Sequence, residues 1–251
     1  FGASVRFYSP KVVFQMMKHL REKYGVRHIM FVDDLFVASR LRVTELCKLL
    51  IESGLNFTWS CTSRVDTIKP DTLELMKKAG CWEISFGLET GSDALLKKMD
   101  KAAEVEKSEQ AVNWTAAAGI RTKGLFMLGY PGETLETIEQ TKAFVRRIPM
   151  TIMNLTKFTP YPGSPIYRDL YGTNIRDDHW ERMNGMNFVW APDGMTVDEL
   201  DRHYQDILMS FYQRPKMGLY YASLSIRYPH HLLRLARFGL GFLAAKIRSY
   251  L

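Results

Sequence analysis

The amino-acid sequence predicts an α/β fold in which consecutive βα units build a parallel sheet. From residue 10 to about residue 160, stretches with helical periodicity alternate with short runs rich in β-branched and aromatic residues. Glycine follows four of the helical stretches, at the position where helices commonly end. The chain has 251 residues and 46% hydrophobic content, so it can bury a large core, and disorder is excluded as its main description.

The first predicted helix shows the signals on which the other elements also depend. Ser9 is a favourable N-cap, Pro10 occupies the first helical position, apolar residues recur on one face as far as Tyr24, and Gly25 ends the helix. The same signals predict further helices at residues 40–53, 70–79, 92–99, 104–118 and 134–147. The β-rich runs predict strands at residues 27–33, 56–62, 81–86, 123–128 and 151–158.

The order of these elements suggests how the chain is organised. Each strand but the last precedes a helix, and because the chain opens on a helix we expect a strand and its loop before Phe1, which makes six units in the intact protein. Residues 161–206 are irregular until a helix that begins at Val197. We therefore divide the chain into a barrel at residues 1–165, a mostly helical substrate-side extension at 166–228 and a tail at 229–251.

The net charge of +7 belongs to the C-terminal part of the chain. No acidic residue follows Asp206, and the basic residues after it account for the whole excess. Residues 229–251 read as a basic amphipathic helix, which can lie against an anionic membrane or dock on protein. The body of the fold is neutral, which argues against nucleic acid as a partner.

Neither the termini nor the cysteines suggest export. The first residues do not resemble a signal peptide, and no apolar run approaches the length of about 20 residues that a membrane span needs. Cys47, Cys61 and Cys81 fit neither a disulfide framework nor a short-spaced metal motif. We expect them to be apolar core residues that do not converge, in a protein of a reducing, cytoplasmic compartment.

Functional residues of a parallel barrel gather on the loops at the C-terminal ends of its strands. Asp33 and Asp34 follow the first strand, and they could bind a divalent metal, act as acid and base, or accept a ligand's ammonium group; otherwise one of them caps the next helix. Arg64 follows the second strand and could bind a carboxylate, or pair with Asp66 instead.

The later strands end in a carboxylate and in glycine-rich turns. Glu89 could accept both hydroxyls of a ribose, or serve as an N-cap or a salt-bridge partner, and Gly87 lets another group approach the backbone. In the turn from Gly129 to Glu133, free N–H groups would suit contact with a nucleobase or a polar ligand. Each of these motifs alone is weak evidence.

Their succession resembles a known family. The runs IMFVDDLF, WSCTSRVD, ISFGLETGS with LLKKMDK, GLFMLGYPGET and FTPYPGSPIY, in this order over residues 1 to about 170, are similar to the radical S-adenosylmethionine (SAM) enzymes. The branch with an N-terminal cobalamin-binding domain is the most similar. The resemblance implies a partial (β/α)6 TIM-like barrel, here without its first strand and cluster loop.

The resemblance also implies roles for residues. Asp33 or Asp34 would receive the methionyl ammonium of SAM, Arg64 its carboxylate and Glu89 its ribose. The adenine would be framed by Gly129, Pro131, Gly132 and Phe158. No residue is assigned a catalytic or metal-binding role.

One feature departs from the family, whose members bind a 4Fe-4S cluster through CxxxCxxC. The chain has no such spacing, so we expect the cluster ligands outside this chain, and expect the fragment alone to be inactive. The resemblance then implies an enzyme that cleaves SAM reductively with an electron donor. Methyl transfer or oxidative rearrangement of an apolar or lipid-like small molecule would follow, with cobalamin as a further cofactor.

Two other interpretations stay open. A cluster-free barrel could serve as a non-catalytic SAM-binding module, and an ordinary barrel hydrolase could use Asp33 and Asp34 on a metal. The basic tail adds the expectation of peripheral contact with the inner face of a membrane.

Overall fold

The computed structural model describes residues 6–172 and 177–227. The chain divides into two compact units, Phe1–Leu208 and Met209–Leu251. The first unit contains the sheet and every residue of the predicted site. The basic tail predicted at residues 229–251 lies outside the described residues.

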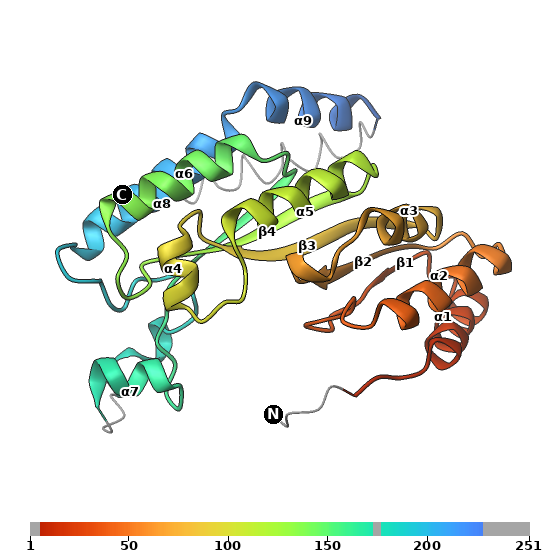
Figure 1. The fold of residues 1–251 in the computed structure, drawn as a ribbon, viewed down its shortest axis with the longest axis horizontal. Helices are drawn as coiled ribbons and strands as arrows, with labels where there is room; N and C mark the ends of the chain where they lie inside the picture. Colours follow the sequence, from red (N-terminus) through yellow and green to blue (C-terminus); the bar gives the residue numbers. More distant parts are fainter. Residues whose placement is uncertain (1–5, 173–176, 228–251) are drawn as a thin grey trace, which may run out of the picture. The chain divides into compact units, whose positions relative to one another are not determined.

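The first unit is built on a parallel sheet whose strands follow one another in sequence order (Figure 1). The sheet is curled into a half-barrel, so the predicted partial barrel is confirmed. Its strands are β1 (His28–Met30), β2 (Thr58–Ser63), β3 (Cys81–Glu89), β4 (Arg121–Leu128) and β5 (Ile152–Lys157).

The helices before and between the strands begin close to their predicted positions. They are α1 (Pro10–Tyr24), α2 (Arg40–Ser53), α3 (Pro70–Lys78), α4 (Asp93–Lys98), α5 (Val105–Ala117) and α6 (Leu135–Arg147). The predicted caps are formed: the Ser9 hydroxyl accepts the Val12 N–H at 3.3 Å, and the Thr134 hydroxyl accepts the Thr137 N–H at 3.3 Å. Each cap satisfies a helix N–H that has no partner inside the helix.

The two faces of the sheet have different surroundings. On the outer face, Phe126 of β4 packs edge-on against Phe144 of α6, and the indole of Trp59 on β2 donates to the Ala79 carbonyl at 2.8 Å. The side chains of Phe126 and Trp59 are almost fully buried. Side chains alternate between the faces of a strand, so the neighbours of these residues point to the inner, concave face. That face is only partly buried in β3 and β4.

The largest differences between the predicted and the observed strands are at the ends of β1 and β3. The first strand was predicted to reach Asp33, but β1 ends at Met30, after which only the Phe31 N–H continues the ladder, to the Ser60 carbonyl at 2.9 Å. Within the described residues β1 pairs with β2 alone, so its end has little support. Conversely, β3 extends past Phe86 to Glu89, because β4 pairs with it through an irregularity between Gly87 and Glu89.

The region after β5 is mostly helical, as predicted. It contains α7 (Pro165–Tyr171), a short 3-10 helix (Asp177–Arg182), and α8 (Val197–Tyr212), which begins at the predicted residue. Two helices were not predicted individually: α7, which Ser164 caps, and α9 (Pro215–Arg227) in the second unit. A membrane-spanning helix would need more length and apolarity than any helix has in the part of the chain that the structure describes.

Candidate functional site

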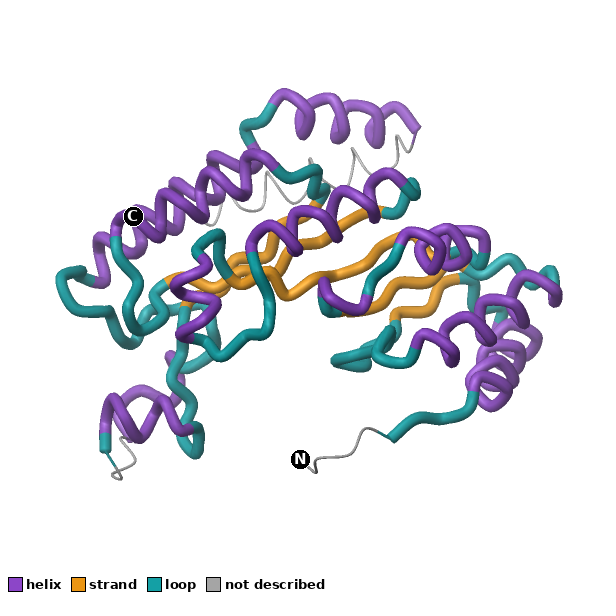
Figure 2. The backbone as a smooth tube through the Cα atoms, in the orientation of Figure 1, coloured by secondary structure: helices purple, strands orange, loops and turns teal. Residues whose placement is uncertain are grey.

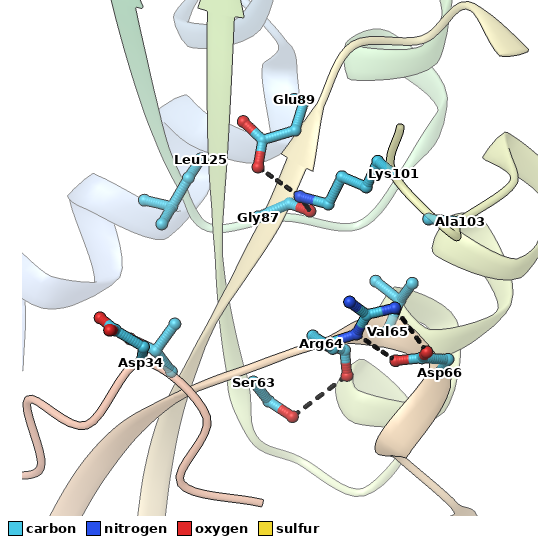
Figure 3. Close-up of a pocket in the computed structure, with 11 residues that line it drawn as sticks. Asp34, Ser63, Arg64, Val65, Asp66, Gly87, Glu89, Lys101, Ala103 and Leu125 are labelled. Carbon is cyan, nitrogen blue, oxygen red and sulfur yellow. Dashed lines mark hydrogen bonds and ion pairs between the residues drawn. The ribbon is translucent and has the colours of Figure 1, made fainter. Parts of the chain in front are cut away.

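A cavity of about 230 Å³ opens beside the C-terminal ends of β1, β2 and β3. The loops that leave these ends gather at one edge of the sheet (Figure 2), as a parallel arrangement requires. Three predicted residues from three successive strand ends, Asp34, Arg64 and Glu89, line this cavity together (Figure 3). The expectation that functional side chains gather at the C-terminal ends of the strands therefore holds for these three residues.

Arg64 makes a bidentate ion pair with Asp66. This pair is one of the two roles that the sequence left open for Arg64. Its Nε lies 2.9 Å from Oδ1 and its Nη2 lies 2.8 Å from Oδ2. These hydrogen bonds lower the pKa of the Asp66 carboxyl and raise the pKa of Arg64. Nη2 also donates to the Ala102 carbonyl, but Nη1 makes no hydrogen bond within the described residues. One edge of the guanidinium can thus still bind an anion.

Glu89 forms an ion pair with Lys101, whose ammonium also donates to the Gly87 carbonyl at 2.6 Å. This is the salt-bridge interpretation; Glu89 does not cap a helix, because the N-cap of α4 is Ser92. Glu89 has φ of 63°, a conformation that is uncommon outside glycine. Such local strain persists only where the surroundings hold it.

Gly87 leaves the space that this ion pair occupies. A Cβ at this position would lie 2.7 Å from Glu89 Oε1 and 2.9 Å from Lys101 Nζ. The prediction that Gly87 allows a close approach is therefore confirmed, and the group that approaches is Lys101. Lys101 was not among the predicted site residues, because nothing in its sequence position shows that the chain after α4 returns to the mouth of the barrel.

The two aspartates after β1 differ in position. Both are exposed, and Asp34 lines the cavity whereas Asp33 does not. Neither caps α2, since the Ser39 hydroxyl does so by accepting the Arg42 N–H at 3.4 Å. Asp34 makes no hydrogen bond or ion pair within the described residues, so its carboxylate is available to a cationic ligand.

The turn from Gly129 to Glu133 is held by the buried carboxylate of Glu133, for which the sequence predicted no separate role. Glu133 is 2% exposed and accepts the Gly129 N–H at 2.7 Å and the Thr137 hydroxyl at 3.2 Å. Burial raises the pKa of Glu133 to about 7. The expectation of free N–H groups is wrong for Gly129 and Glu133, because the Glu133 N–H donates within the turn, to the Tyr130 carbonyl at 2.9 Å.

An aromatic cluster stands beside this turn. Phe158 is 4% exposed and contacts the rings of Tyr130 and Trp190 edge-on, with centroids 5.3 Å and 5.8 Å away. The residues predicted to frame the adenine lie at the same end of the sheet as the cavity, but they do not line it: Gly129, Pro131, Gly132 and Phe158.

The three cysteines lie in the core, as expected, but they are closer together than predicted. The side chains of Cys61 and Cys81 interact, and burial together with this contact raises the pKa of the Cys81 thiol. Burial raises the pKa of Cys47 to about 12, with a smaller contribution from Cys81. All three thiols are buried, and within the described residues no group of three His, Cys, Asp or Glu side chains is arranged to hold a metal ion.

Comparisons with known proteins agree on one family. Residues 2–145 match the model of the radical SAM superfamily. The chain is 28% identical over 218 residues to an uncharacterized methyltransferase of Pyrococcus horikoshii, covering 86% of this chain and 48% of that protein. It is 29% identical over 216 residues to the anaerobic magnesium-protoporphyrin IX monomethyl ester cyclase of Rubrivivax gelatinosus, covering 85% of this chain and 38% of that protein.

A solved structure shares the fold. The radical SAM methyltransferase of Kitasatospora setae, solved with cobalamin and a 4Fe-4S cluster, superimposes with a TM-score of 0.55 over 59% of this chain and 31% of that chain, at 18% identity. At 18% identity, this similarity shows a shared fold and nothing about function. The chain spans less than half the length of the two curated relatives, 48% and 38%.

Proposed function

Because this chain belongs to the radical SAM superfamily, we propose that the cavity beside β1, β2 and β3 binds S-adenosylmethionine. The main support is the convergence of Asp34, Arg64 and Glu89 from successive strand ends. The methionyl end of SAM is a zwitterion, and the cavity offers the carboxylate of Asp34 and one edge of the Arg64 guanidinium, which make no hydrogen bond with any described residue. The residues present therefore fit the polar end of SAM. Because the chain belongs to this family, we no longer interpret Asp33 and Asp34 as the metal ligands of a hydrolase.

The remaining contacts with SAM follow the same logic. Asp33 or Asp34 binds the ammonium group, Arg64 binds the carboxylate, and Glu89 accepts the ribose hydroxyls. Lys101 holds the Glu89 carboxylate in place before a ligand arrives. We assign the adenine to the turn formed by Gly129, Pro131 and Gly132 and to the aromatic ring of Phe158, which contacts that turn through Tyr130.

Membership of the superfamily implies a 4Fe-4S cluster as well as SAM. The described residues do not fit that cluster, since they contain no suitable group of three ligands and the three thiols are buried. We propose that its ligands lie outside this chain and that the chain alone does not cleave SAM. The two relatives described above support the proposal that the whole protein is an enzyme, since one is named a methyltransferase and the other a cyclase.

For the whole protein we propose cobalamin-dependent methyl transfer, or oxidative rearrangement, on an apolar or lipid-like small molecule, with a reducing electron donor. A methyltransferase with the same fold was solved with cobalamin, which supports that cofactor. Peripheral membrane contact through residues 229–251 of a cytoplasmic protein is also proposed, on the charge of that segment. Nucleic acid is not a proposed partner.

Replacing Glu89 with glutamine tests the SAM site. We expect SAM affinity to fall by about 1 to 3 kcal/mol, the usual loss when a charged acceptor is removed, which is roughly 5-fold to 150-fold in the dissociation constant. Titration calorimetry measures the affinity. Glu104→Gln is a matched control, because Glu104 pairs with Lys107 on the exposed surface. Equal affinity for SAM in both variants, with a lower melting temperature for Glu89→Gln, would show that Glu89 has only a structural role.

The alternative of a non-catalytic SAM-binding module predicts a different result with the full-length protein. After anaerobic reconstitution with iron and sulfide and addition of a reductant, we expect SAM to be converted to 5′-deoxyadenosine or S-adenosylhomocysteine. Binding of SAM without either product would favour the module instead.

A further inference from the structure

Three polar side chains stand at one level of the concave face of the sheet. Thr62 of β2 is in register with Ser85 of β3, and Ser85 is in register with Lys123 of β4. All three are partly buried, and their side chains make no hydrogen bond or ion pair in the part of the chain that the structure describes. We refer to Thr62, Ser85 and Lys123 as the donor row.

The position of the donor row follows from the alternation of side chains along a strand. Gly87 and Leu125 line the cavity, and Ser85 and Lys123 lie two residues before them on the same strands, so they share the same face one layer deeper. The alternate residues of these strands point outward, as the contact of Phe126, the residue after Leu125, with Phe144 of α6 shows. Thr62 itself lines the cavity and connects it to the row.

Among the residues that the structure describes, no carboxylate pairs with the ammonium of Lys123, whereas the neighbouring cations are all paired. Arg64 pairs with Asp66, Lys101 with Glu89, and Arg121 with Glu83 at 3.5 Å. Lys123 is the cation among them that has no carboxylate partner within the described residues. A partly buried ammonium without a counter-charge is unfavourable, and it becomes favourable when an anion binds beside it.

We propose that the donor row binds a carboxylate or phosphate group of the substrate, in the layer of the half-barrel beneath the SAM cavity. Neighbouring strands lie about 4.8 Å apart, so one ammonium and two hydroxyls stand side by side within reach of a single anion. Leu125, one layer above Lys123, offers an apolar wall to the rest of the molecule. The substrate class is then an organic anion with an apolar body. This inference rests on the proposed function for the identity of the upper cavity.

Titration of the full chain with octanoate, and separately with inorganic phosphate, tests the row. We expect NMR chemical-shift changes to show binding of at least one probe, and Lys123→Met to weaken that binding at least tenfold. Lys78→Met, an exposed lysine on α3, is the matched control and should bind like the unaltered chain. Binding of octanoate alone would assign a carboxylate, and binding of phosphate alone would assign a phosphate group.

The same variants separate this proposal from that for the SAM site. SAM affinity should stay unchanged in Lys123→Met, and Lys123→Arg, which keeps the charge, should retain most of the probe binding even if the methionine variant folds poorly. Failure of both probes to bind the unaltered chain, or equal binding by Lys123→Met, would overturn the proposal. A tenfold loss of SAM affinity in Lys123→Met would do so too, because the row would then hold the carboxylate of SAM. If SAM fails to bind while octanoate still depends on Lys123, only the proposed function fails.

Discussion

Replacing Gly91 with alanine is expected to reduce the free energy of unfolding by about 3 kcal/mol, at the upper end of the usual cost of overpacking. A Cβ at this position would lie 2.7 Å from the Gln140 carbonyl oxygen, from Thr141 Cα and from Phe144 Cβ. None of these atoms is the free end of a flexible side chain, so either the loop after β3 or helix α6 must move. For a unit of this size, the loss corresponds to a fall of roughly 6 to 12 °C in the melting temperature.

The displaced loop is the one that positions Glu89. The Gly91 N–H donates to the Thr141 hydroxyl at 3.0 Å, and the Thr90 and Thr141 hydroxyls share a hydrogen bond of 2.9 Å. These contacts fasten the loop to α6, two residues after Glu89. We therefore expect Gly91→Ala to weaken SAM binding as well as to destabilise the fold.

Gly87→Ala is the matched control for this measurement. Its added Cβ would meet only the ends of the Glu89 and Lys101 side chains, which can rotate away. Thermal unfolding followed by circular dichroism should show a change of no more than about 2 °C for Gly87→Ala, within the usual range for substitutions of small effect. A melting temperature for Gly91→Ala equal to that of the unaltered chain would contradict the steric argument.

Much of the fold could be predicted from local signals. Caps and helix-ending glycines are local, and the helices from α1 to α6 were placed within a few residues by them. The end of β1 could not be predicted, because the apolar run continues to Val32 while the ladder with β2 stops soon after Met30. Strand length depends on the neighbouring strand, which the sequence of one strand does not contain.

In the candidate site, too, some residues could be predicted from the sequence and others could not. Asp34, Arg64 and Glu89 could be placed together because the rule about strand ends is a property of topology. The residues that hold these side chains in place could not be predicted. Lys101 follows α4 in the chain and pairs with Glu89 at the end of β3, and no local sequence pattern indicates that these two segments meet. For Glu133 the sequence predicts only a place in a turn, because burial of a carboxylate depends on the packing around it.

Glu133 is expected to make the stability of the barrel depend on pH. Burial raises its pKa to about 7 in the folded chain, against a value near 4.3 for an exposed glutamate. Between these values the folded chain binds the proton and the unfolded chain does not, so stability falls as pH rises through this window. The contribution is fully present below the unfolded pKa and is lost above about pH 7; it amounts to about 3 to 4 kcal/mol.

Urea unfolding at pH 5 and pH 8 measures this effect in the unaltered chain and in Glu133→Gln. Glutamine is neutral at both pH values, and it can still accept the Gly129 N–H and donate to the Thr137 hydroxyl, so it imitates the protonated acid. We expect the unaltered chain to lose about 2 to 3 kcal/mol more than Glu133→Gln between the two pH values. Glu136→Gln, which alters an exposed carboxylate on the helix that follows the turn, should keep the pH dependence of the unaltered chain. Parallel pH dependence in Glu133→Gln and the unaltered chain would mean that the Glu133 carboxylate is already charged at pH 5, held by its hydrogen bonds within the turn.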